Sequence, residues 1–121
     1  MTDFNLIDSS VWLAYLEGEE IAEPYINSGA GVATSVIVLF EVAKRYKKLN
    51  YPVQKIKTAL SLIKERSVLF NVDEETVNFA INFSDSLSLA DALLYATSQL
   101  NSFKLITKDN DFRGLANVKI L

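Results

Sequence analysis

Residues 4–16 read FNLIDSSVWLAYL, a short apolar run followed at once by a polar residue and a helical pattern. The apolar run at 4–7 predicts a buried strand. The segment at 8–18 predicts a helix capped by Asp8 or by a following serine. A strand that leads directly into a helix is the building unit of folds with a parallel sheet.

The same unit recurs along the rest of the chain. Short apolar runs predict four more strands, at 31–34, 67–72, 103–107 and 117–121. Helical spacing and capping residues predict further helices at 18–29, 36–50, 53–66, 73–84 and 88–100. We therefore expect an α/β fold with a central parallel sheet of about five short strands. Helices should cover both faces, and ligands should sit beyond the carboxyl ends of the strands.

The composition restricts the chemistry that the chain can carry. Its 121 residues suit one domain, so we expect a single domain over 1–121. The chain has no cysteine and no histidine, which removes disulfides, thiolate nucleophiles, the usual zinc sites and Ser-His-Asp catalysis. Any catalysis must then use carboxylates, lysine, tyrosine, hydroxyls or a carboxylate-bound metal.

Charge and hydropathy bear on partners and location. The net charge of −3 gives no overall basic surface for nucleic acid. Eight of the 12 basic residues nevertheless lie between positions 44 and 66, either as solvated helix faces or as a surface that meets phosphates. The stretch 24–40 is too polar to span a membrane, and the N-terminus lacks the features of a secretory signal. We expect a cytoplasmic protein with no membrane partner.

Carboxylates occur near the ends of the predicted strands. Asp8 follows the first strand, and Asp109 and Asp111 follow the fourth. Glu41 interrupts the apolar helix after the second strand, and Asp91 lies at the start of the most apolar helix. Because the carboxyl ends of parallel strands meet at one edge of the sheet, these five acids are expected to converge there.

Each of these acids also has an ordinary structural explanation. Asp8 suits a helix cap, and Asp91 with Ser88 resembles a capping box. Glu41 and Arg45 have the spacing of an exposed pair on one helix, although the apolar neighbours of Glu41 argue against full exposure. A turn rich in Asp and Asn is common in loops.

Taken together, the acids favour a metal site. Several carboxylates in a small space repel one another and need cations to stay ionised. Mg²⁺ and Mn²⁺ are hard ions that prefer oxygen ligands. Such ions lower the pKa of bound water and stabilise the charge that develops on a phosphodiester, a role that would replace the missing histidine.

Four segments in this order and spacing resemble the PIN-domain nucleases, most closely the toxin subunits of VapBC-type toxin-antitoxin pairs. They are LIDSSVWLAYL (6–16), TSVIVLFEVAKRY (34–46), LSLADALLYATSQ (87–99) and LITKDNDFRGL (105–115). The resemblance implies a three-layer α/β/α fold and a single nuclease domain. It implies a Mg²⁺- or Mn²⁺-dependent endoribonuclease that cleaves RNA with a metal-bound water. It also implies two protein partners, a cognate antitoxin and a second copy in a homodimer.

The resemblance also assigns residues. It places the four catalytic acids, which are also metal ligands, on Asp8, Glu41, Asp91 and Asp109. Asp111 is a further ligand that substitutes for Asp109 or assists it. The hydroxyls expected to line the site belong to Ser10 and Thr107.

The sequence leaves the phosphate contacts, the role of the aromatic residues and two alternative functions undecided. The candidate phosphate contacts are Lys44, Arg45 and Lys108. The aromatic residues Trp12, Tyr15, Phe40 and Tyr95 have helical spacing, which is more typical of core positions than of base stacking. Two alternative functions remain, a non-catalytic PIN-fold binding module and a receiver-like phosphoacceptor domain in which Lys108 would follow a late strand.

Overall fold

The protein forms a five-stranded sheet in a computed structural model that describes residues 4–121. The strands are β1 (Phe4–Ile7), β2 (Gly31–Ser35), β3 (Val68–Phe70), β4 (Lys104–Thr107) and β5 (Val118–Ile120). Every neighbouring pair is parallel, in the order β3-β2-β1-β4-β5. The predicted parallel sheet of about five short strands is therefore confirmed.

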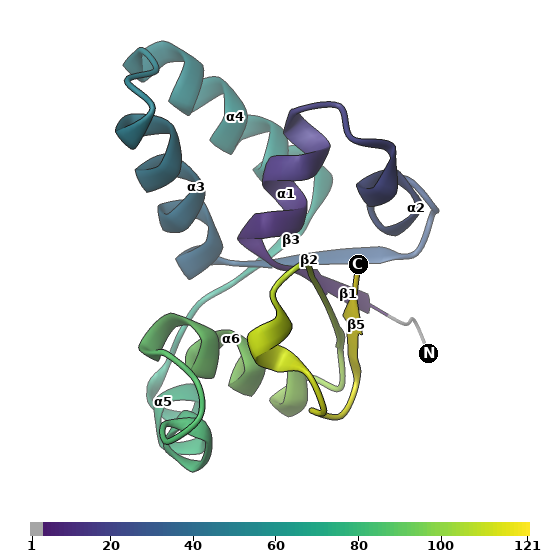
Figure 1. Cartoon of the computed structure of the whole chain (residues 1–121), viewed down its shortest axis with the longest axis vertical. Helices are drawn as coiled ribbons and strands as arrows, with labels where there is room; N and C mark the ends of the chain where they lie inside the picture. The colour runs from purple at the N-terminus through teal and green to yellow at the C-terminus, as the bar shows by residue number, and fades with distance from the viewer. Residues whose placement is uncertain (1–3) are drawn as a thin grey trace.

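Helices form a layer on each face of the sheet, which confirms the predicted three-layer arrangement (Figure 1). The first layer holds α1 (Ser9–Leu16), α2 (Glu23–Ile26), α3 (Val36–Lys48) and α4 (Val53–Arg66). The second holds α5 (Glu74–Ala80) and α6 (Leu89–Leu100), which pack against each other. Short 3₁₀ turns complete the chain at Glu20–Ala22, Ile81–Phe83 and Asn110–Phe112.

Local sequence explains where the helices begin. The Asp8 carboxylate accepts a hydrogen bond from the Ser9 backbone N–H, and the Ser35 hydroxyl accepts one from the N–H of Ile37. Each cap satisfies a backbone donor that the helix itself leaves free. The third cap, Ser88, accepts from the N–H of Asp91 at 3.3 Å. Three predicted helix starts are thus confirmed by side-chain contacts.

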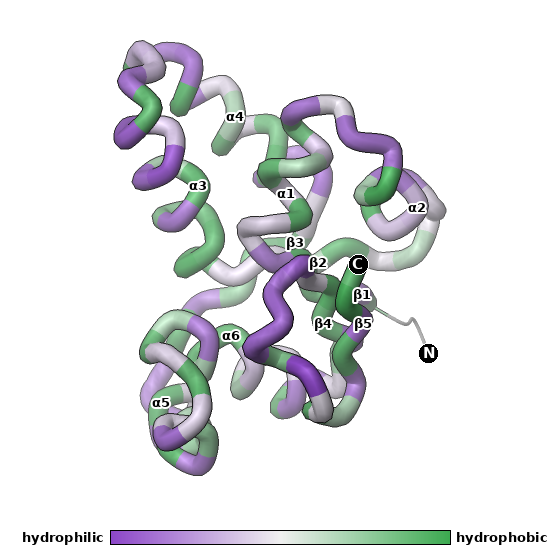
Figure 2. The backbone as a smooth tube through the Cα atoms, viewed as in Figure 1, coloured by the Kyte–Doolittle hydropathy of each residue, from purple (hydrophilic) through white to green (hydrophobic). Residues whose placement is uncertain are grey.

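The sheet is buried between the two helical layers. Leu6 and Ile7 of β1 and Leu105 and Ile106 of β4 are fully buried, in keeping with a central parallel pair covered on both faces. In Figure 2 the strands are mostly apolar, and the turn after β4 is hydrophilic. Within residues 4–121, no helix has the length and apolar character needed to cross a membrane.

A few predicted elements differ in extent. The third strand is shorter than the predicted 67–72: β3 covers only Val68–Phe70, at the edge of the sheet. The segment at 18–29 forms a 3₁₀ turn and the four-residue α2 rather than one helix, with Pro24 in its first turn. The segment at 73–84 likewise ends as a 3₁₀ turn after α5.

The strand order identifies the edge at which a ligand would bind. From β1 the chain adds β2 and β3 on one side, and then crosses to add β4 and β5 on the other. The reversal leaves a crevice beyond the carboxyl ends of β1 and β4, the usual ligand position in open α/β sheets. A receiver domain has the order 2-1-3-4-5, so the receiver-like alternative is wrong.

Candidate metal centre

Asp8 lies at the carboxyl end of β1, in the crevice between β1 and β4. It is only 5% exposed, and its carboxylate accepts several hydrogen bonds. Oδ1 accepts from the Ser9 N–H at 2.7 Å, and Oδ2 accepts from the hydroxyls of Ser10 at 3.1 Å and Thr107 at 2.6 Å. The two hydroxyls named from the sequence therefore both contact this one oxygen.

The same hydroxyls hold the loop that follows β4. Ser10 Oγ accepts from the backbone N–H of Lys108 at 3.0 Å, and Thr107 Oγ1 accepts from that of Asp109 at 3.0 Å. Because each hydroxyl accepts from the loop, its own proton is directed at Asp8. This arrangement ties the position of the loop to the carboxylate of the neighbouring strand.

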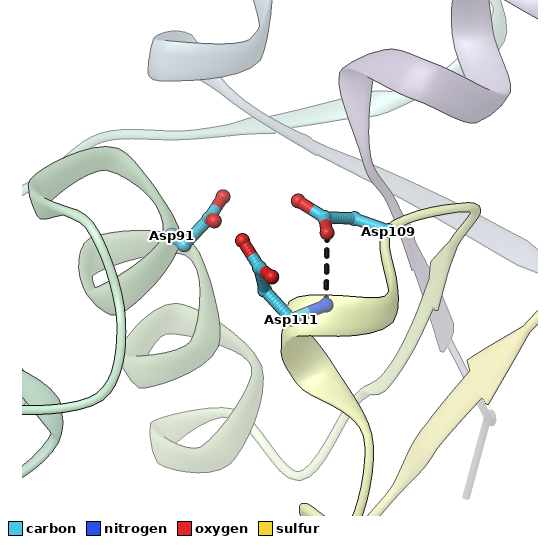
Figure 3. A group of neighbouring side chains, drawn as sticks. All are labelled: Asp91, Asp109 and Asp111. Carbon is cyan, nitrogen blue, oxygen red and sulfur yellow. Dashed lines mark hydrogen bonds between the residues drawn. The ribbon is translucent and has the colours of Figure 1, made fainter.

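Three other acids form a closer group. Asp91 of α6 and Asp109 and Asp111 of the loop each offer an oxygen, and these oxygens all lie within 4.8 Å of one another. Figure 3 shows the three side chains pointing toward a common space. Asp109 Oδ1 also accepts from the N–H of Asp111 at 2.9 Å, which fixes the turn that carries both side chains.

Glu41 lies on α3, next to the other acids. It is half-buried, and within the described residues 4–121 it forms no ion pair with Arg45 or any other base. The explanation of Glu41 as an exposed helix pair is therefore wrong. The buried side of α3 carries Val38, Val42 and Tyr46, so Glu41 belongs to a different face of the helix.

Burial is the main cause that raises the pKa values of three acids in this region, and the charges of neighbouring acids add to it. Burial, reinforced by the charges of Asp8 and Asp91, raises the pKa of Glu41 to about 7. Burial, together with the charges of Asp8 and Asp109, raises the pKa of Asp91 to about 6. Burial also raises the pKa of Asp8, against the opposing effect of its hydrogen bonds. The site is therefore short of positive charge at neutral pH.

The site opens into a groove of about 570 Å³ along α3. Its lining comes from α1, α3 and the start of α6, and consists of Ser9, Leu13, Ile37, Phe40, Glu41, Lys44, Arg45, Lys48, Leu89, Ala90 and Leu93. Two candidate phosphate contacts, Lys44 and Arg45, thus lie beside a catalytic candidate. Lys108 instead pairs with Glu19 at 3.3 Å.

The donor set fits a hard divalent cation. Three carboxylates lie close together, with oxygens near the spacing that ligands adopt around one ion. No base within residues 4–121 forms an ion pair with any of them. A divalent ion would favour the ionised form of Asp91, whose pKa is raised by burial and by the charges of Asp8 and Asp109. Asp91, Asp109 and Asp111 would hold the ion, with Asp8 and Glu41 beside them.

Some residues of this region were missed from the sequence. Ser9 lines the groove, and its hydroxyl also lies 3.4 Å from Asp8 Oδ1. Lys48 follows Glu41 by seven residues, so helical periodicity places it on the same face. Among the aromatic residues expected in the core, Trp12 and Tyr95 are buried, but Phe40 is 68% exposed.

A family model described as the PIN domain matches residues 6–118. The chain belongs to the PIN domain family. No curated protein sequence matches it significantly.

Solved structures share the fold of this PIN domain along nearly its whole length. A chain of a toxin-antitoxin complex from Klebsiella pneumoniae is 26% identical, with a TM-score of 0.77 and 95% of each chain covered. VapC20 of Mycobacterium tuberculosis, described as a sarcin-ricin loop cleaving toxin, is 19% identical, with a TM-score of 0.76 and coverage of 96% of this chain and 98% of that one. A chain of VapBC2 from Rickettsia felis, bound to a promoter DNA fragment, is 12% identical, with a TM-score of 0.74 and coverage of 98% and 97%.

Proposed function

We propose that this PIN domain is a metal-dependent endoribonuclease and the toxin of a toxin-antitoxin pair. The observation that carries the proposal is the convergence of Asp91, Asp109 and Asp111, with oxygens within 4.8 Å, beside Asp8 at the end of β1. Family membership and the likeness to a chain of the Klebsiella toxin-antitoxin complex support it. In this proposal residues 1–121 act as one nuclease domain.

The proposed cofactor is Mg²⁺ or Mn²⁺, held by the cluster of Asp91, Asp109 and Asp111. When bound, such an ion supplies a more acidic water and neutralises charge on the reacting phosphate. Asp8 would add its negative charge beside the ion, and the hydroxyls of Ser10 and Thr107 would hold its carboxylate in place. Glu41 would present the carboxylate that faces the substrate groove.

Basic side chains around the groove would position the RNA. Lys44 and Arg45 lie on its wall and are exposed, which suits contacts to phosphates on either side of the bond that is cut. Lys108 is a weaker candidate, because its ammonium group already pairs with Glu19. Substrate phosphate would have to compete with that carboxylate.

The proposed protein partners are an antitoxin and a second copy of the chain, all in the cytoplasm. Exposed apolar side chains on the α5 and α6 side support protein contacts, since Val77, Ile81 and Leu89 border an apolar pocket of about 300 Å³. Continuous apolar surface of this kind is typical of interaction sites.

The experiment is cleavage of a mixed RNA pool by purified, antitoxin-free protein with Mg²⁺, Mn²⁺ or EDTA. The Asp8→Asn and Asp91→Asn variants run beside the wild type. Metal-dependent cutting that both substitutions abolish is the expected result. Absence of both cutting and Mn²⁺ binding by calorimetry would favour a non-catalytic PIN-fold module.

A further inference from the structure

The sheet ends in two different edge strands, β3 on one side and β5 on the other. We propose that the free edge of β3 pairs with β3 of a second copy of this chain. The two strands run antiparallel about a two-fold axis at Phe70, so that two sheets join into one. The inference rests on the proposed homodimer and adds to it the interface and the register. It does not depend on ribonuclease activity.

The outer edge of β3 is free in the part of the chain that the structure describes. β3 pairs with β2 along one side, and among residues 4–121 no strand lies on its other side. No turn or loop of residues 4–121 forms a backbone hydrogen bond with residues 68–72. Because an edge strand directs a row of N–H and C=O groups away from the sheet, those of β3 are available to another chain.

The side chains of β3 are uncovered on both faces of the sheet. Val68 is 52% exposed and Leu69 is 38% exposed, and successive residues of a strand point to opposite faces. In the central strand β1, by contrast, Leu6 and Ile7 are fully buried. A monomer would leave the apolar edge of β3 open to uncontrolled association, whereas pairing with a second strand covers it.

The opposite edge of the sheet is protected in a way that β3 is not. β5 carries the exposed Lys119 at its middle position, and a lysine on an edge strand opposes pairing with another strand. The run SVLFNV (67–72) contains no charged residue and no proline. The pairing of β3 with β2 also proceeds residue by residue, without a bulge that would turn the edge away. With one open edge per chain, the assembly closes at two copies.

Charges at the two ends of the run 67–72 favour a second copy as the partner. Residues 64–66 carry a net positive charge, residues 73–75 carry a net negative charge, and all six are exposed. None of them forms an ion pair within residues 4–121. In an antiparallel pair the basic end of one copy lies beside the acidic end of the other, and the two-fold axis repeats this contact. A parallel pair would place like charges together.

Symmetry restricts the register of such a pair. Residues directly opposite each other on antiparallel strands point to the same face of the sheet, while neighbours along one strand alternate between faces. A two-fold axis must therefore pass where one residue lies opposite its own copy. The centre of the run 67–72 offers two such positions, Leu69 and Phe70.

The position at Phe70 gives the better set of cross-strand neighbours. With the axis there, Val68 lies opposite Val72 of the second copy. Arg66 then lies opposite Glu74, at the points where α4 ends and α5 begins. The alternative axis would place Arg66 opposite Val72 instead. Apolar and opposite-charge pairs across two strands stabilise a sheet, so the first register is favoured.

Single cysteines test the register, because the chain contains no cysteine of its own. Val68→Cys and Val72→Cys proteins should each stay uncross-linked when oxidised alone, since the two copies of either position are about 14 Å apart along the strands. Mixed together, they should form a disulfide dimer on a non-reducing gel, because a disulfide needs Cα atoms within about 7 Å. Leu69→Cys is the control for the alternative axis, and cross-linking of this variant by itself would overturn the register at Phe70.

Sedimentation tests whether the edge of β3 holds the dimer. Val68→Lys should convert the wild-type dimer into a monomer, because it places a charge on the pairing edge. The exposed side chain should let the variant fold, as circular dichroism checks. Glu74→Lys should weaken dimerisation about threefold at low salt and less at high salt. Val77→Lys is the matched control, because it places the same charge on the apolar pocket of α5 and α6 and should leave the dimer intact.

The remaining outcomes separate this interface from the proposed function. A monomer produced by Val77→Lys and not by Val68→Lys places the dimer contact on α5 and α6 and rejects the pairing of β3. A wild-type dimer without a cross-link between the mixed cysteine variants rejects it as well. A wild type that is monomeric at every concentration rejects both the interface and the homodimer, while RNA cleavage still decides the nuclease. Dimerisation through β3 without RNA cleavage supports the interface and rejects the nuclease.

Discussion

The Thr107 hydroxyl donates a hydrogen bond of 2.6 Å to Oδ2 of Asp8, which joins the carboxyl ends of β4 and β1. Thr107 is fully buried, and its oxygen also accepts from the N–H of Asp109 at 3.0 Å. One side chain therefore connects an acid on the central strand with the loop that carries two others. The arrangement of the site depends on this contact as much as on the acids themselves.

Thr107→Val should lower the free energy of unfolding by about 1–3 kcal/mol, because it removes a buried donor to a carboxylate. The loss should grow from pH 4 to pH 8, since the bond favours ionised Asp8. Urea unfolding at both pH values measures it, and Mn²⁺ calorimetry should show weaker binding. Thr107→Ser is the control that keeps the hydroxyl. If Thr107→Ser lowers the free energy of unfolding as much as Thr107→Val does, the lost packing of the methyl group explains the effect.

Asp91→Asn should raise the stability of the metal-free protein at pH 8, or leave it unchanged. The substitution removes a charge that Asp8 and Asp109 repel, and the Ser88 cap accepts from the backbone N–H, which is retained. The thermal unfolding midpoint in EDTA measures the outcome. A clear loss of stability would favour the non-catalytic module, in which the acid serves the fold.

The metal-free protein should be more stable at pH 5 than at pH 8. The pKa of Glu41 is raised from 4.5 to about 7, and that of Asp91 from 3.8 to about 6. Between these values the unfolded chain has released protons that the folded chain retains, so stability falls as pH rises from about 4 to 7. After allowance for solvent screening of these half-buried groups, roughly 1 kcal/mol is expected.

Glu41→Gln provides the check on this pH dependence. The variant should show a flatter profile of thermal midpoint against pH in EDTA, because one of the two strongly shifted groups has been removed. A wild-type midpoint that rises steadily from pH 5 to pH 8 in EDTA would contradict the electrostatic account of the site.

Mn²⁺ should stabilise the protein at pH 8 and much less at pH 5. The ligands must be ionised to bind, so protons compete with the ion in the range where Asp91 and Glu41 titrate. At 100 times the dissociation constant the gain is about 2.7 kcal/mol. Thermal unfolding with Mn²⁺ or EDTA at both pH values measures it, and Ca²⁺ serves as a second oxygen-binding ion.

Asp109→Asn should weaken Mn²⁺ binding more than Asp111→Asn. Asp109 is half-buried and is directed by the Asp111 N–H, whereas Asp111 is exposed. An Asn at 109 can still accept that hydrogen bond through its amide oxygen, so the turn is kept and only the charge is lost. Calorimetry on both variants compares the two, and a larger loss from Asp111→Asn would reverse the assignment of the fourth acid.

Most of the fold followed from local patterns. The order of strands and helices, the caps at Asp8, Ser35 and Ser88, and the parallel sheet were all predicted, because each depends on a few neighbouring residues. The errors lie where local signals are weak. The segment at 18–29 contains Pro24 and few periodic apolar residues, and the edge strand β3 has few apolar contacts.

For the candidate site, the sequence supplied the acids but not their grouping. Position along the chain says which acids follow strands, yet the distance between Asp91 and Asp111 depends on how α6 packs against β4 and how the loop turns. The pairing of Lys108 with Glu19 joins positions 89 residues apart, and no local pattern predicts it. Phe40 has the helical spacing of a core residue, and only the packing of α3 leaves it exposed.

The sequence by itself determined the family, the strand-helix alternation and the set of carboxylates, because these are properties of residue type and short-range spacing. Tertiary structure decided which acids lie within reach of one ion, which cations stay unpaired and which aromatic ring faces the groove. The physical reason is the sheet order: β4 lies next to β1 and brings Thr107 beside Asp8, although the two residues are 99 positions apart in the sequence.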